Sequence, residues 1–105
     1  MAWVCLVLAG LLEVVWAVGL KHANGFSRLV PSVITVSAMF ASFWLLSVAM
    51  RTLPLGTAYA IWTGIGAVGA FIVGILCFGE AITATRVTAI LLVLSGLTLL
   101  KVSTP

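Results

Sequence analysis

An acidic side chain interrupts a long apolar run near the start of this chain of 105 residues. Glu13 is the only charged residue in the segment 1–20. A charge at the centre of a bilayer costs at least about 2.5–3.5 kcal/mol on insertion scales, so residues of this kind are functional by default. A carboxyl at that depth can hold a proton on one side of a membrane and exchange it for a cation on the other. The alternative is a structural glutamate bonded to a neighbouring helix.

Helical spacing places Gly10 and Trp16 one turn before and one turn after Glu13. Gly10 leaves space beside the carboxylate. The ring of Trp16 can form a wall for a cation by cation–π contact, or its indole N–H can donate. We therefore expect both residues at a substrate- and proton-binding site, although Trp16 could instead be a packing or interfacial residue.

Two later segments carry polar groups that could reach the same carboxylate. Tyr59 and Trp62 are one helical turn apart. When such large rings are buried, their O–H and N–H groups usually form hydrogen bonds. Glu13 is the obvious partner. Ser42 lies near the middle of its own segment, where its hydroxyl could fix the carboxylate. The alternatives are an aromatic packing stripe for the rings and a small packing residue for the serine.

Small residues predict two further roles. Gly64 and Gly66 form a cluster at which a helix can bend, which suits a conformational hinge beside a site. Close helix packing is the equal alternative. Ala89 and Gly96 lie seven residues apart on one face of the last apolar segment, so we interpret that helix as a dimerisation helix.

The composition explains which elements must position these residues. Hydrophobic residues make up 64% of the chain and charged residues only 7%, whereas soluble domains carry about 25% charge. The net charge of +3 comes from five scattered basic residues, which excludes a nucleic-acid binder. No nucleophile–base arrangement, phosphate loop or metal-ligand cluster is visible, so we expect no enzyme, cofactor or metal.

Four segments are long and apolar enough to cross a membrane, because about 20 apolar residues span the hydrocarbon core. They are residues 3–20, 31–50, 54–78 and 85–101. The expected fold is therefore an all-α integral membrane protein, with four transmembrane helices in a single domain over residues 1–105.

The basic residues give this chain almost no preferred orientation. Four spans place Arg51 and Lys101 on one side of the membrane, and Lys21, Arg28 and Arg86 on the other. Orientation follows the Lys/Arg bias, so copies inserted both ways and a single weakly set topology are equally open. Transporters usually contain inverted repeats, and no internal repeat is visible here. Two oppositely inserted copies would supply that symmetry, which favours an antiparallel homodimer with dual topology.

Three stretches resemble the small multidrug resistance family of proton-coupled exporters. They are AGLLEVVWA at residues 9–17, NGFSRLVPS at 24–32 and PLGTAYAIWTGIG at 54–66. The resemblance implies an antiparallel dimer in which two Glu13 carboxylates share one site, where protons and cations compete. It also implies that Ser42 and Trp62 are hydrogen-bond partners of Glu13. It further implies that Tyr59 is a gating contact and that Trp16 is a wall of the site.

The family has one branch that exports guanidinium and one that exports hydrophobic quaternary ammonium drugs. Gly10, the run 13–17 and Lys101 are similar to the guanidinium branch, whereas residues 43–46 are similar to the drug branch. The resemblance thus implies a bacterial plasma-membrane antiporter for guanidinium-type cations. The alternatives are a broader quaternary ammonium or small-drug exporter and a non-transporting membrane subunit.

Overall fold

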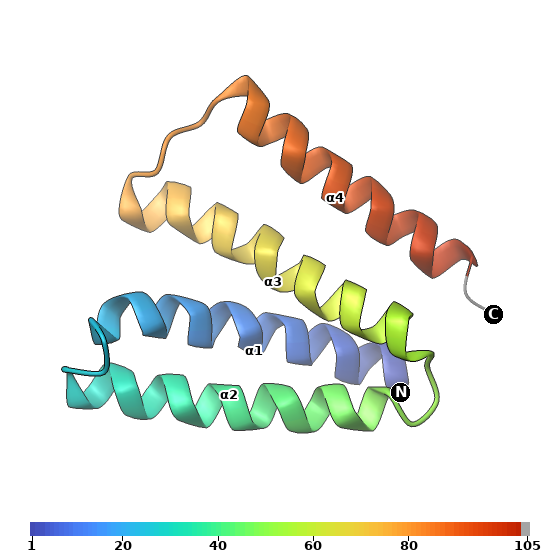
Figure 1. Cartoon of the computed structure of the whole chain (residues 1–105), viewed down its shortest axis with the longest axis horizontal. Coiled ribbons are helices and arrows are strands. Elements are labelled where there is room, and N and C mark those ends of the chain that lie inside the picture. The colour runs from blue at the N-terminus through green and yellow to red at the C-terminus, as the bar shows by residue number, and fades with distance from the viewer. Residues whose placement is uncertain (104–105) are drawn as a thin grey trace.

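The computed structural model describes residues 1–103 as four helices joined by short connectors. The helices are α1 (Ala2–Ala23), α2 (Leu29–Ala49), α3 (Leu55–Phe78) and α4 (Ala84–Ser103). Each is long and apolar enough to cross a membrane, which confirms the prediction of four spanning helices. Successive helices run in opposite directions, so that the two ends of the chain lie on the same side of the molecule (Figure 1).

Local sequence signals explain where the helices end. α1 continues three residues past its predicted end at residue 20, and Asn24 then adopts a left-handed conformation with φ 47°. Gly79 ends α3 in the same way, with φ 64°, a backbone conformation that glycine adopts at little cost. α2 begins at Leu29, before Pro31, because proline is tolerated within the first helical turn.

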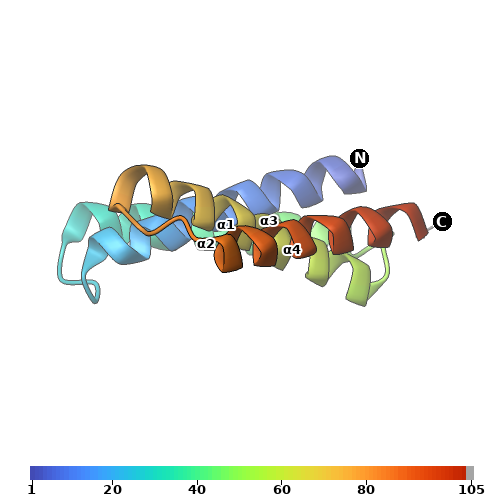
Figure 2. The same ribbon diagram turned by 90° about the horizontal axis from the view of Figure 1, so that it is seen from above.

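The helices form a thin slab rather than a closed bundle. The Cα extents are 43 × 35 × 16 Å, and Figure 2 shows the four helices in a shallow layer. α1 packs against both α2 and α3, whereas α4 approaches only the backbone of α3. Because the layer is thin, residues of this chain cover the polar groups of α1 to α3 on one side only.

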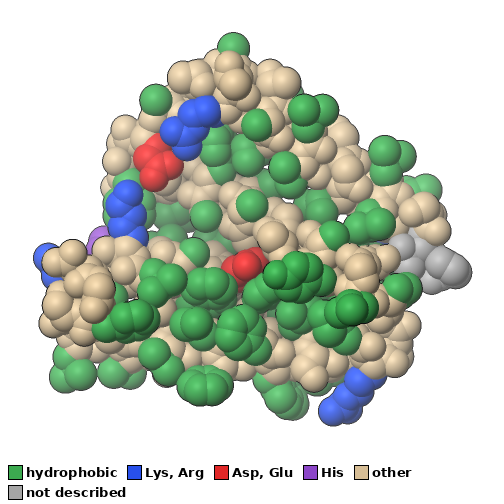
Figure 3. Space-filling model, viewed as in Figure 1, with side chains coloured by type: hydrophobic (Ala, Val, Ile, Leu, Met, Phe, Trp, Pro, Cys, Tyr) green, Lys and Arg blue, Asp and Glu red, His purple; other side chains and the backbone are tan. Residues whose placement is uncertain are grey.

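The core lies between α1, α2 and α3 and contains many small residues. Its members are Leu6, Ala9, Leu46, Ala49, Ala58, Ile61 and Trp62. Small residues let helix backbones approach closely, which is how helices associate in membranes without a hydrophobic driving force. No residue of α4 is buried among those described. Hydrophobic side chains cover much of the outer face (Figure 3).

Candidate functional site

Glu13 lies near the middle of α1, and its carboxylate packs against the backbone of α3 at Gly66. A β-carbon at Gly66 would overlap carboxylate atoms of Glu13. The glutamate is half-buried, so part of its side chain remains accessible. The absence of a side chain at Gly66 is therefore what allows the carboxylate to lie between the two helices.

Gly10 lies at the contact between α1 and α3, and its role at the binding site stays a prediction. A β-carbon at Gly10 would overlap the side chain of Ile65 on α3, and one at Gly69 would overlap Val14 on α1. These glycines bring α1 and α3 close together, while the space beside the carboxylate comes from Gly66. Spacing along one helix places Gly10 near Glu13, but it does not reveal which side chain of the opposing helix fills the gap.

Two polar atoms of the site are buried without a hydrogen-bond partner in the described part of the chain. One is the Oε1 atom of Glu13, and the other is the indole Nε1 atom of Trp16 on the next turn of α1. Buried polar groups are almost always paired, and each exception needs an explanation. The carboxylate oxygen can accept an N–H donor from a small cation, and the face of the Trp16 ring can contact the same cation, whereas the indole N–H is itself a donor.

Trp62 and Ser42 come together, but they do not bond to Glu13. The indole N–H of Trp62 donates to Ser42 Oγ at 2.9 Å, and the Ser42 hydroxyl donates to the backbone carbonyl of Ala9 at 2.7 Å. This connection joins α3 to α2 and α2 to α1. In a regular helix the Ala9 carbonyl also accepts the amide of Glu13. Ser42 therefore bonds to the backbone turn that carries Glu13, and Trp62 is connected to that turn only through Ser42.

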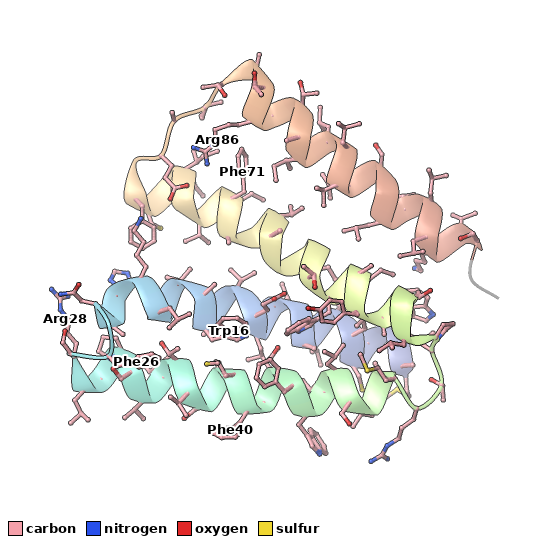
Figure 4. All side chains as sticks on the ribbon, viewed as in Figure 1. Trp16, Phe26, Arg28, Phe40, Phe71 and Arg86 are labelled. Atoms are coloured by element: carbon pink, nitrogen blue, oxygen red, sulfur yellow. The ribbon has the colours of Figure 1, made fainter. Side chains whose placement is uncertain are left out.

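Four aromatic rings extend from α3 across α2 to α1. Tyr59 and Trp62 have ring centroids 5.7 Å apart, Trp62 and Phe43 are 5.8 Å apart, and Phe43 and Trp16 are 6.3 Å apart. Figure 4 shows Trp16 between α1 and α2. Phe43 was not predicted as a site residue. Its ring has no polar group, so the only signals for it were its position next to Ser42 and its resemblance to the drug branch.

Tyr59 stands at the exposed end of this row. Its side chain is 54% exposed, whereas Trp62 is only 7% exposed. The exposed position is compatible with a gating contact to another molecule, and that role stays a prediction.

The two glycines expected to act as a hinge both lie inside one continuous helix, α3. A β-carbon at Gly64 would overlap Leu97 of α4, and one at Gly66 would overlap Glu13. Close packing, the alternative interpretation, is what both glycines provide in this structure, and hinge motion stays a prediction. On α4, Ala89 and Gly96 are exposed and make no interhelical packing contact that buries them.

The second acidic residue, Glu80, lies in the connector between α3 and α4, away from this site. Its carboxylate accepts a hydrogen bond from Arg86 at 3.1 Å and forms an ion pair with Lys21 at 3.7 Å. The Arg86 guanidinium also lies 5.1 Å from the ring centroid of Phe71, as Figure 4 shows between α3 and α4. A carboxylate and an aromatic ring thus hold a guanidinium group within this chain.

Residues 1–93 match the family model described as Small Multidrug Resistance protein. Three curated proteins named Guanidinium exporter illustrate the degree of similarity. The protein of Citrobacter freundii is 59% identical over 104 residues, which is 99% of each chain. The protein of Escherichia coli is 61% identical over 104 residues, again 99% of each chain. That of Salmonella typhimurium is 61% identical over 103 residues, 98% of each chain.

Proposed function

Because the chain belongs to the small multidrug resistance family, we propose that it exports guanidinium-type cations across the bacterial plasma membrane in exchange for protons. The observation that carries this proposal is the buried, unpaired carboxylate oxygen of Glu13 in the middle of a spanning helix. The relatives at about 60% identity are named as guanidinium exporters, which supports a transport function. It is a multi-pass membrane protein.

The chemistry of the site suits guanidinium. This ion is planar, and its N–H groups pair with carboxylates in charge-assisted hydrogen bonds, two at a time in the best geometry. Glu13 offers the acceptor, and Trp16 offers a ring for cation–π contact. The same combination of carboxylate and ring holds the guanidinium of Arg86 at the far end of α3.

A second copy of the chain completes the site in this proposal. The slab is only 16 Å thick in its Cα extent, and Glu13 is half-buried. A single chain therefore encloses the Glu13 carboxylate on one side only. The near-even distribution of basic residues supports copies inserted in opposite orientations. In the resulting antiparallel dimer two Glu13 carboxylates face a shared cavity, and the exposed Ala89 and Gly96 of α4 form the contact between copies.

Exchange follows from competition at these carboxylates. A guanidinium ion stabilises the charged form of Glu13, and a proton removes that charge, so the two ligands exclude each other. Open to the outside, the site takes up protons and releases the cation, and open to the cytoplasm it does the reverse. With two Glu13 carboxylates in the dimer, two protons enter for each cation that leaves, so each cycle moves one net positive charge inwards. Inward proton flow then drives outward transport of the cation and generates a current.

One observation favours a wider cargo range as a second candidate function. Phe43, which belongs to the stretch that is similar to the drug branch, lies between Trp16 and Trp62. Its ring adds apolar surface to the aromatic row. Substituted guanidinium ions and small quaternary ammonium ions could use that surface, so they belong in any transport assay.

The direct test is transport in proteoliposomes, with guanidinium and tetramethylammonium gradients compared in the same preparation. We expect a proton-coupled current with guanidinium that is lost in Glu13→Gln. The matched control is Glu80→Gln, which removes the other carboxylate and should retain coupled transport. Currents with tetramethylammonium alone would assign the chain to the drug branch. Proton-coupled guanidinium transport by Glu13→Gln would contradict the mechanism, and no current with any cation would favour a non-transporting subunit.

A further inference from the structure

A crevice of about 280 Å³ opens between α1, α3 and α4, at the end of the molecule where the chain begins and ends. Its walls are mainly apolar and come from three helices, with Trp3 and Val7 on α1, Ile65 on α3, and Leu97, Thr98 and Lys101 on α4. A neighbouring groove of about 290 Å³ along α1 shares Trp3 and Val7 with it. Together they form a continuous apolar path along the outside of α1.

A basic residue lies at the edge of this crevice without an acidic partner. The Lys101 ammonium lies 5.4 Å from the ring centroid of Trp3. The chain has only two acidic side chains. Glu80 is held by Lys21 and Arg86 at the opposite end of α4, and Glu13 is in the middle of α1. Within residues 1–103, therefore, Lys101 has no carboxylate side chain to neutralise it.

We propose that this crevice binds an anionic phospholipid, with its phosphate on Lys101 and an acyl chain along the apolar wall. Tryptophan and lysine near helix ends lie at the level of the lipid headgroups, so the ammonium is at the depth of the phosphate. The charges are complementary, and basic residues near a membrane surface attract anionic lipids. The groove that continues along α1 gives the acyl chain a surface running towards the membrane interior.

The crevice lies on the face of α4 opposite to the proposed contact between copies. Thr98 follows Ala89 by nine residues, which is about two and a half turns at about 3.6 residues per turn. Around the helix axis Lys101 lies about 60° from Thr98 and about 120° from Ala89. Leu97 lies about 80° from Ala89, at the edge of the crevice face. A dimer formed through Ala89 and Gly96 would therefore leave the crevice open to lipid.

Native mass spectrometry of the purified protein tests this site, with phosphatidylglycerol and phosphatidylcholine of identical acyl chains added in parallel. We expect preferential retention of phosphatidylglycerol, and a loss of roughly fivefold in its affinity in Lys101→Gln. The matched control is Arg51→Gln, which removes an exposed charge on the same side of the membrane but outside the crevice. Equal retention by wild type and Lys101→Gln would overturn the proposal, as would an equal loss in Arg51→Gln.

A second variant tests the crevice itself. Thr98→Trp keeps Lys101 but fills the space beside it, so we expect it to lose bound phosphatidylglycerol while the mass of the protein assembly stays unchanged. If the assembly instead dissociated and lipid were retained, the crevice would be an interface between copies and the lipid proposal would be wrong.

Discussion

Gly66 on α3 makes room for the carboxylate of Glu13 on α1. The carboxylate therefore lies directly against a helix backbone, and this contact fixes how far the acidic group extends from α1. Any side chain at position 66 must displace either Glu13 or the helix that carries it. The contact also explains why a glycine is needed in the middle of α3 despite its unfavourable helix propensity.

We expect Gly66→Ala to displace the carboxylate of Glu13 and to weaken cation binding, with little change in the stability of the fold. The atoms that a β-carbon would meet are the end of the flexible Glu13 side chain, which can move aside, and alanine favours the helix by about 1 kcal/mol over glycine. The matched control is Gly56→Ala on the same helix, where a β-carbon meets nothing within 4 Å. Thermal unfolding in detergent and guanidinium titration measure both effects. Identical behaviour of the two variants would refute the close contact.

Trp62→Phe tests the hydrogen bond between α3 and α2. The variant keeps an aromatic ring but removes the N–H that donates to Ser42, so unfolding should become easier by about 0.5–1.5 kcal/mol. Trp44→Phe is the control, because Trp44 is 66% exposed on α2. A large loss of guanidinium affinity at unchanged stability would instead mean that the Trp62 indole bonds to Glu13 or the cargo.

Ser42→Ala should destabilise the fold more than Trp62→Phe does. The substitution removes both the acceptor for Trp62 and the donor to Ala9 at a fully buried position. A buried N–H left without a partner costs about 1–3 kcal/mol. The effects of Ser42→Ala and Trp62→Phe should also be less than additive in the double variant, since each removes the same bond. Full additivity in chemical denaturation would show that the bond contributes nothing.

The helices were predictable because their signals are local. Four apolar segments, the glycines and prolines at their ends, and an isolated Glu13 within a span can all be read from neighbouring residues. The bonds within the site were not predictable. Ser42 pairs with Trp62 and Ala9 rather than with Glu13 because relative rotation of three helices decides which polar atoms meet. Gly10 and Gly66 illustrate the same limit, since each glycine's role depends on the side chain that another helix places over it.

Proton release on cation binding should distinguish competition at Glu13 from simple cation binding. Addition of guanidinium to the detergent-solubilised protein in weak buffer should acidify the solution, because the cation displaces protons from the carboxyl. The apparent guanidinium affinity should accordingly weaken as the pH falls. Glu80→Gln should release protons as wild type does, and Glu13→Gln should release none. Guanidinium binding without proton release in the wild type would rule out the exchange mechanism while leaving the binding site intact.

The exposed face of α4 provides the test of the contact between copies. A β-carbon at Gly96 meets nothing within 4 Å in the single chain, so Gly96→Leu should leave the folded chain intact while obstructing close approach of a second α4. We expect the dimer to dissociate in detergent and coupled transport to be lost. Ser95→Leu adds similar bulk on an adjacent face of the same turn, and it should retain the dimer. Mass measurement by light scattering, corrected for detergent, decides between them, and an intact Gly96→Leu dimer would move the contact to another surface of the slab.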